Sequence, residues 1–354
     1  SNAHYTELKS AAHSAYSGNL SFILPAADGS SGQFLKTDGS GNLAFAAAGG
    51  GASASDDLYI ANPSSATNPT AGGTNAVAIG SGAVAATNES IALGLNATVG
   101  SSTRGTALGF SANATGSQAT AISDSVASGG NSFAAVADAT ASGTDSIALG
   151  RATTASSAYA AAIGKNSSDQ GSVAPSGTAA MALGGSYASG TDSFAAAIAN
   201  NTSSYGAQGT SSIAMGHQSK STGNYAVAIG SAQATGSDYG VSIGYNARSA
   251  NHSTVAIGRE AGLAGSGSSS VSIGHEASSS GSDSLAIGRN VTANASSSVA
   301  IGAYARVGGI IGKYAFANDY INGAGDAQQG KYVLHVSTTN ATAIALTSTG
   351  TSAS

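Results

Sequence analysis

The sequence predicts an all-β solenoid, and three observations carry this prediction. A short apolar motif of the type VAIG recurs along most of the chain at a spacing close to 14 residues. Within each copy, large apolar residues alternate with Ala or Ser, and a period of two is typical of a strand with one buried face. Gly accounts for 50 of the 354 residues and Ser is abundant, which disfavours helices. A period this short indicates units that stack on one another and cannot fold alone.

The last residue of each motif, here called the marker position, is usually Gly. We count 16 marker positions, and nine of the fifteen spacings between them equal 14 residues. The marker positions are Gly80, Gly94, Gly109, Ser123, Ala137, Gly150, Gly164, Gly184, Ala199, Gly216, Gly230, Gly244, Gly258, Gly274, Gly288 and Gly302. A Gly there lets the chain turn where a side chain would clash. The three exceptions indicate either that the position does not require positive φ or that their coils are distorted.

Fourteen residues suffice for two strands of about five residues and two short turns. The lumen of such a coil holds only small and β-branched side chains. We therefore expect pairs such as Val255 and Ile257 to face the lumen, with the Ala three residues after the marker, such as Ala261, packed opposite. Longer marker spacings of 20 and 17 residues place insertions near residues 168–177 and 200–209, where they protrude from turns.

A single thin roll is a poor monomer. Its narrow file of small side chains gains about 25 cal/mol per Å² of buried apolar surface. The backbone entropy that opposes folding is about 1–2 kcal/mol per residue. The energetics therefore predict that the roll covers a second face with copies of itself.

The composition divides the chain into five parts. Asp28-Gly29 and Asp38-Gly39 are turn signals, so the N-terminal part is expected to form short strands at NLSFILP, QFLKT and their neighbours. In the C-terminal part KYVLHVS and TAIALTS have the pattern of strands, and we expect a further domain to follow Ser354. The parts are a remnant of tag cleavage at 1–3, an N-terminal β segment at 4–50, a Gly/Ser/Ala-rich linker at 51–73, a roll of about 16 coils at 74–305 and a C-terminal β segment at 306–354.

The units NAVAIG, SIALG and VAIG, joined by stretches such as SASG and ATGS, resemble the head repeats of YadA-like trimeric autotransporter adhesins. The resemblance covers residues 74–305. It implies a left-handed parallel β-roll in which three chains lie side by side as a homotrimer. It also implies display on a bacterial surface and binding to host ligands.

The two ends resemble a different class of protein. GNLSFILPAADGSSGQFLKTDGSGNLAFA at 18–46 and GDAQQGKYVLHVSTTNATAIALTSTG at 325–350 resemble segments of tail-fibre proteins of tailed bacteriophages, including marine phages. This resemblance implies a place in a virion, with other tail proteins as partners.

Composition excludes or disfavours several other functions. The chain has no Cys, which excludes disulfides and thiolate metal sites, and its net charge of -5 gives no basic surface for nucleic acid. No apolar run approaches the ~18 residues of a membrane helix, so we expect no membrane insertion of this segment. None of the six His has a metal-ligand spacing, and no GxSxG motif lies in a strand–turn–helix context. We expect no enzymatic activity and no cofactor.

The residue after each marker position forms what we call the post-marker column, because in a solenoid these residues stack along one edge. Four of the twelve Lys and Arg residues fall in its 16 positions, which are less than a twentieth of the chain. The candidate binding residues are Arg151, Lys165, His217, Tyr245, Arg259, His275 and Arg289. One interpretation is a basic ladder that faces an anionic polymer such as a surface glycan. The other is structural, with cations that pair across a subunit boundary with Glu260, Glu276, Asp238 or Asp283, or that keep the rod soluble.

Tyrosine gives a second candidate feature. Seven Tyr lie within the roll, where a coil of small residues has little room for them, so many are expected outside the lumen. They are Tyr159, Tyr187, Tyr205, Tyr225, Tyr239, Tyr245 and Tyr304. Exposed Tyr stacks on sugar rings, but Tyr also fills gaps between subunits and hydrogen-bonds at their rim.

The sequence thus predicts a non-enzymatic, homotrimeric tail fibre of a phage virion that acts as a rigid spacer and binds a host-surface glycan or protein. The first alternative is the head of a bacterial trimeric autotransporter adhesin at the cell surface, which binds host matrix or glycan. The second is a polysaccharide-degrading tailspike, although such enzymes favour wider coils.

Overall fold

The computed structural model describes residues 23–31, 33–38, 40, 42–47, 67–101, 103–165, 171–174, 176–198, 204–236 and 238–331. The chain forms two units, Ser1–Pro63 and Ser64–Ser354, and each is treated by itself. The tag remnant, most of the linker and the C-terminal strands expected after Lys331 lie outside the described residues. So do the start of NLSFILP and the marker Ala199.

In the first unit, β1 (Gln33–Thr37) pairs antiparallel with β2 (Leu43–Ala47). Asp38 closes the connection, because its carboxylate accepts the backbone N–H of Ser40 at 2.7 Å and the side-chain amide of Asn42 at 2.6 Å. The Asn42 amide is the main reason that the pKa of Asp38 lies below its usual value. QFLKT is therefore a strand, and its partner follows the second Asp-Gly signal.

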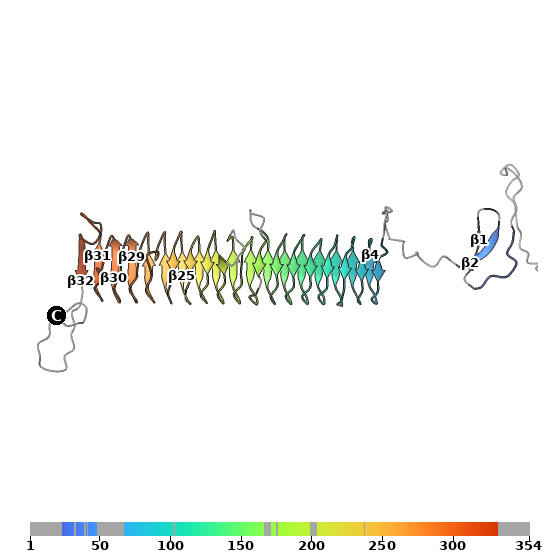
Figure 1. Ribbon diagram of the computed structural model, residues 1–354, viewed down its shortest axis with the longest axis horizontal. Coiled ribbons are helices and arrows are strands. Elements are labelled where there is room, and N and C mark those ends of the chain that lie inside the picture. The colour runs from blue at the N-terminus through green and yellow to red at the C-terminus, as the bar shows by residue number, and fades with distance from the viewer. Residues whose placement is uncertain are drawn as a thin grey trace, which may run out of the picture. The chain divides into compact units, whose positions relative to one another are not determined.

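The second unit is a parallel β-roll in which each coil adds one strand to a continuous sheet (Figure 1). In the described residues this sheet has seventeen parallel strands, one more than the predicted number of coils. They are β4 (Val77–Ile79), β6 (Ile91–Leu93), β8 (Thr106–Leu108), β10 (Thr120–Ile122), β12 (Phe133–Ala135), β14 (Ile147–Leu149), β16 (Ala161–Ile163), β18 (Met181–Leu183), β19 (Phe194–Ala196), β21 (Ile213–Met215), β23 (Val227–Ile229), β25 (Val241–Ile243), β27 (Val255–Ile257), β28 (Val271–Ile273), β29 (Leu285–Arg289), β30 (Val299–Ala303) and β31 (Tyr314–Ala317). The stack therefore continues past residue 305, the predicted end of the roll. The left hand of the winding stays a prediction of the resemblance.

Two-residue strands on the other side of the coils form shorter sheets. The first contains β3 (Thr70–Ala71), β5 (Val84–Ala85), β7 (Thr98–Val99), β9 (Asn113–Ala114), β11 (Val126–Ala127), β13 (Thr140–Ala141), β15 (Thr154–Ala155) and β17 (Val173–Ala174). The second contains β20 (Gly206–Ala207), β22 (Lys220–Ser221), β24 (Gln233–Ala234) and β26 (Arg248–Ser249). Parallel strands pair in step along the roll, so that equivalent residues of successive coils stack in columns.

The lumen of the roll is filled mainly by Ala and Ser, with a few larger residues such as Val99, Val291 and Val307 that also have no exposed surface. In one coil the inward side chains are Ala83, Ala85, Ser90 and Ala92, and each has no exposed surface. The Ala expected to point inward three residues after the marker does so; Ala261, for example, has no exposed surface. Four such residues fill a coil of this size.

The expectation that the Val/Ile pairs face the lumen is wrong. In β27 the central Ala256 is 1% exposed, whereas Val255 and Ile257 lie on the outer face and are only half-buried. In other coils Ile91 and Ile147 are 39% and 42% exposed. The alternation is as expected, but every parallel strand of the continuous sheet has Ala or Ser at its inward position, and its larger residues lie outside. They form a continuous column on the outer face, which we call the apolar stripe.

Buried serines satisfy the backbone at one of the two turns. The hydroxyl of Ser270 donates to the Gly267 carbonyl at 2.7 Å, and that of Ser284 donates to the Gly281 carbonyl at 2.6 Å. Both serines are at least 98% buried. The abundance of Ser thus has a structural cause, since an unpaired buried carbonyl would cost about 1–3 kcal/mol.

The marker Gly is required for two reasons. Gly258 has a φ of +127°, which L side chains rarely adopt, and a Cβ there would lie 2.4 Å from the Gly274 carbonyl oxygen of the next coil. The two exceptions among the described residues lie in distorted coils. Ser123 takes a left-handed φ of 56°, and the coil of Ala137 instead places Val136 and Asp138 at 81° and 61°.

The C-terminal end of the roll is capped. Strand β32 (Gln328–Lys331) pairs antiparallel with β31. The Gln328 side chain accepts the Arg306 N–H at 2.9 Å and donates to the Arg306 carbonyl at 2.8 Å. In the loop before it, backbone N–H groups of Ile321, Asn322 and Gly323 lower the pKa of Asp326 to about 2. These contacts pair backbone groups that a further coil would otherwise satisfy.

The double requirement at the marker position gives a test. Gly258→Ala adds a strained φ and a clash with the next coil, so we expect it to destabilise the roll by about 2–4 kcal/mol. Gly308→Ala is the matched control, because Gly308 has a φ of +65° but nothing within 4 Å of its Cβ. It should cost about 1 kcal/mol. Denaturant unfolding followed by circular dichroism measures both, and equal losses would contradict the role of the clash.

Candidate functional site

The post-marker column lies at the corner where each coil leaves the continuous sheet. Its backbone is fixed from coil to coil. The N–H of Glu276 donates to the Arg259 carbonyl at 2.9 Å, and the N–H of Asn290 donates to the His275 carbonyl at 2.8 Å. Post-marker side chains of successive coils are therefore held about one strand spacing apart, about 4.8 Å.

The structure brings four predicted residues together and leaves the others apart. Tyr245, Arg259, His275 and Arg289 belong to the consecutive coils of β25, β27, β28 and β29. His217 follows β21 and is exposed, but the next post-marker residue is Ser231, so it does not extend this group. We call the four-residue group the C-terminal ladder.

Arg151 and Lys165 form a second, smaller group, since they follow the paired strands β14 and β16. The Arg151 Nε lies 4.0 Å from the Asp138 carboxylate of the preceding coil, and both side chains are exposed. Lys165 forms an antiparallel bridge with Gly171 and thus stands at the base of the first predicted insertion. Val173–Ala174, predicted as part of this insertion, instead forms strand β17 of the roll and pairs with β15.

Arg259, His275 and Arg289 each have a side-chain neighbour in their own chain. The Arg259 guanidinium lies 3.1 Å from Glu260, and the His275 Nε2 lies 3.7 Å from Glu276. The Arg289 guanidinium lies 4.8 Å from the centre of the Tyr304 ring, which in turn contacts Tyr320 edge to face. Partly exposed pairs of this kind contribute about 1 kcal/mol each. The acids Glu260 and Glu276 therefore pair within one chain.

Tyr225 and Tyr239 are exposed at the opposite turn. Both have positive φ, 56° and 63°, which is unusual for a bulky residue. Their rings stack 5.2 Å apart across coils, and Tyr239 also meets the edge of His252 at 5.5 Å. Stacking within the chain thus covers one face of each of these two rings.

Sequence reasoning missed a set of basic residues on the outer face of the two-residue strands. Lys220, Arg248 and Arg306 occupy the outward position of these strands, four residues after their marker positions. The alternation within each short strand is the signal that would have identified them.

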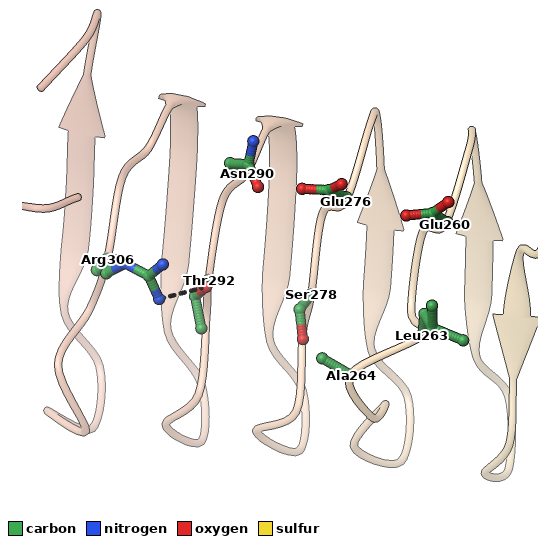
Figure 2. A pocket seen from close by; sticks show the side chains of 8 residues that line it. All are labelled: Glu260, Leu263, Ala264, Glu276, Ser278, Asn290, Thr292 and Arg306. Atoms are coloured by element: carbon green, nitrogen blue, oxygen red, sulfur yellow. Dashed lines mark hydrogen bonds between the residues drawn. The ribbon is translucent and has the colours of Figure 1, made fainter. Parts of the chain in front are cut away.

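Sequence reasoning also missed a groove of about 400 Å³ on this face. Figure 2 shows Glu260, Glu276 and Asn290 in one row across neighbouring coils, with Arg306 directed at the Thr292 hydroxyl. The Arg306 Nη1 donates to that hydroxyl at 3.0 Å. Leu263, Ala264 and Ser278 complete the lining. The 16-residue spacing between Gly258 and Gly274 is the signal in the sequence, because the extra residues supply Leu263 and Ala264.

Comparison with protein families identifies the repeating unit. A family model described as the YadA head domain repeat, in two copies, matches residues 71–97, 101–122, 141–167, 207–232, 236–261 and 266–290. The roll carries YadA head domain repeats. All seven candidate binding residues lie inside the matched YadA repeats, whereas Leu263 and Ala264 fall between two of them. The comparison with curated proteins gave no match. Among the described residues, none belongs to a helix that is long and apolar enough to cross a membrane.

The Arg289–Tyr304 contact predicts that Arg289 contributes to the stability of the roll. Arg289→Ala should destabilise the roll by about 0.5–1 kcal/mol through loss of the cation–π contact. Arg259→Ala is the control, since its exposed pair with Glu260 should contribute less than about 0.5 kcal/mol. Urea unfolding followed by circular dichroism compares the two, and a larger loss for Arg259→Ala would contradict the assignment.

Proposed function

We propose that this chain is part of a non-enzymatic, homotrimeric adhesin fibre that serves as a rigid spacer and binds a host surface through the C-terminal ladder. The observation that carries the proposal is the apolar stripe. YadA head repeats belong to adhesins that assemble as homotrimers, which supports both the function and the number of chains.

The apolar stripe supports self-association on physical grounds. Each of the seventeen strands places at least one large side chain outward, and twelve of them place two. Met181 and Leu149, for example, are 41% and 39% exposed. A column that spans seventeen strands is far longer than the isolated apolar patches of soluble monomers. Copies arranged around an axis parallel to the roll would cover it in every coil, which cyclic symmetry permits.

The receptor class follows from the ladder. Tyr245, Arg259 and Arg289 are exposed and follow one another at the coil spacing with His275. Regularly spaced cations suit a polymer with repeated negative charges, such as an anionic surface glycan. The neighbouring Glu260 and Glu276 moderate this attraction, so contact rather than long-range steering is expected to dominate.

Two biological settings of the fibre, a phage virion and a bacterial cell surface, fit these features. The segments at 18–46 and 325–350, which resemble phage tail-fibre sequences, support a virion with other tail proteins as neighbours. The head repeats support the surface of a bacterium, where trimeric autotransporter adhesins are displayed. Immunogold labelling of purified virions and of intact cells with an antibody to the roll distinguishes the two.

One test of the proposed function concerns the apolar stripe. Ile257→Asp places a carboxylate on the half-buried outer face of β27, so a single coil keeps its Ala-filled lumen while the contact between copies gains an unpaired buried charge. We expect the molar mass measured by light scattering to fall from three chains toward one. Asp283→Asn, an exposed change at a turn, should leave it unchanged. A wild-type protein that is monomeric at micromolar concentration would contradict the proposal.

The second prediction concerns the ladder. Arg259→Ala combined with Arg289→Ala should weaken binding to heparin, used as an anionic glycan, about tenfold, since two exposed charge contacts contribute about 1.4 kcal/mol together. Arg104→Ala combined with Lys220→Ala removes the same charge outside the column and should have little effect. Calorimetry measures both. If both double variants lost heparin affinity equally, the effect would come from net charge and not from the ladder. Release of reducing sugar from a polysaccharide would instead favour the tailspike alternative.

A further inference from the structure

The groove exists because one coil is longer than its neighbours. The second short-strand sheet ends at β26, and the following coil has no two-residue strand at the equivalent place but a turn at residues 259–264. Leu263 stands out from this turn with 48% of its surface exposed. Single bridges from Ser278 to Thr292 and from Thr292 to Arg306 resume the pairing further on. Leu263 therefore forms a wall between the groove and a smaller hollow of about 90 Å³ beside Arg248.

The groove offers both kinds of hydrogen-bonding group. Glu260 and Glu276 supply acceptors, Arg306 supplies donors, and Asn290 supplies both. Leu263 and Ala264 add an aliphatic surface on one side. The volume of the groove lies within the range of about 300–1,000 Å³ that is usual for small-ligand pockets, and most of the residues that line it are polar.

The charges in and beside the groove balance. The two carboxylates of Glu260 and Glu276 are accompanied by the two guanidinium groups of Arg259, 3.1 Å from Glu260, and Arg306. A ligand with a strong net charge of either sign would be repelled at one end of the groove by a side chain of the same charge. A ligand that carries many hydroxyl groups and no charge would instead use every acceptor and donor in the groove.

The spacing of these groups favours an extended chain of sugars. Glu260, Glu276 and Asn290 occupy equivalent positions in consecutive coils, because the Glu276 N–H bonds to the residue before Glu260 and the Asn290 N–H bonds to the residue before Glu276. They therefore repeat at about 4.8 Å along the roll, which is close to the length of one pyranose ring. Vicinal hydroxyls of successive rings would each face one polar side chain.

We propose that the groove between Leu263 and Arg306 is a binding site for an uncharged, hydroxyl-rich oligosaccharide that lies along the roll. Glu276 accepts hydrogen bonds from ring hydroxyls, and Asn290 both donates and accepts them. Arg306 donates at the far end, and Leu263 packs against the C–H face of one ring. This site borders the C-terminal ladder, because Glu260 and Glu276 lie beside Arg259 and His275. It takes a different class of glycan, so uncharged oligosaccharides and heparin test the two proposals separately.

The test uses the intact fibre and a panel of linear oligosaccharides: maltohexaose, cellohexaose, chitohexaose and a heparin hexasaccharide. Saturation-transfer NMR detects binding at millimolar ligand, and calorimetry measures the affinity. Glu276→Gln keeps the shape of the groove and removes one charged acceptor, so it should weaken binding about tenfold. Glu89→Gln is the matched control, since Glu89 pairs with Arg104 at 2.6 Å in a distant coil.

Deletion of Leu263 and Ala264 gives the sharpest variant, because it returns the marker spacing from 16 to 14 residues. We expect the β spectrum to persist and binding to be lost. Should this variant fail to fold, Leu263→Ser removes the apolar wall without changing the coil. The proposal is overturned if no uncharged member of the panel binds. It is also overturned if binding survives Glu276→Gln and the changes at residue 263, or if only the heparin fragment requires the groove.

Discussion

The width of the lumen is the constraint on which the rest of the structure depends. Backbone hydrogen bonds between successive coils hold about fourteen residues in a closed path, and the inward position of the continuous sheet admits only Ala or Ser. Ala92, Ala107 and Ala121 follow one another in this way with no exposed surface. The larger apolar residues of this sheet therefore lie outside. The chain thus gains much of its order from backbone pairing, and it leaves its largest apolar side chains half-exposed for contact with other copies.

The strict register has a second consequence, since each position of the repeat becomes a column along the rod. The chemistry of a column changes with the sequence while its geometry stays the same. The post-marker column has the acids Asp124 and Asp138 in two successive coils and then Arg151 and Lys165 in the next two. Further along, it becomes the C-terminal ladder. The charge of a column can thus differ from coil to coil along the rod without any change in the backbone. Binding groups can therefore vary while the fold stays the same.

Several features were predictable because the repeat expresses them once per coil. Period-two alternation predicted strands, the marker Gly predicted the corner, and the post-marker column predicted that Arg259 and Arg289 lie on one edge. Alternation does not say which face points inward, and the usual preference for large apolar residues inside failed because size decides in so thin a coil. The last coil was missed because Tyr314–Ala317 has no marker Gly. The groove was missed because it depends on residues as far apart as Glu260 and Arg306.

In the described part of this roll, concave sites arise at irregular coils and not at regular ones. A run of identical coils presents straight, parallel columns, and such a surface offers contacts along a line but no hollow. A hollow requires a coil that differs in length, as at Gly262–Gly265, where two hollows flank Leu263. This stretch lies between two matched YadA repeats. The family pattern therefore covers the coils on either side, whereas Leu263, which forms the wall, lies outside it. The repeat therefore determines the rod, and its interruptions determine where a small ligand fits.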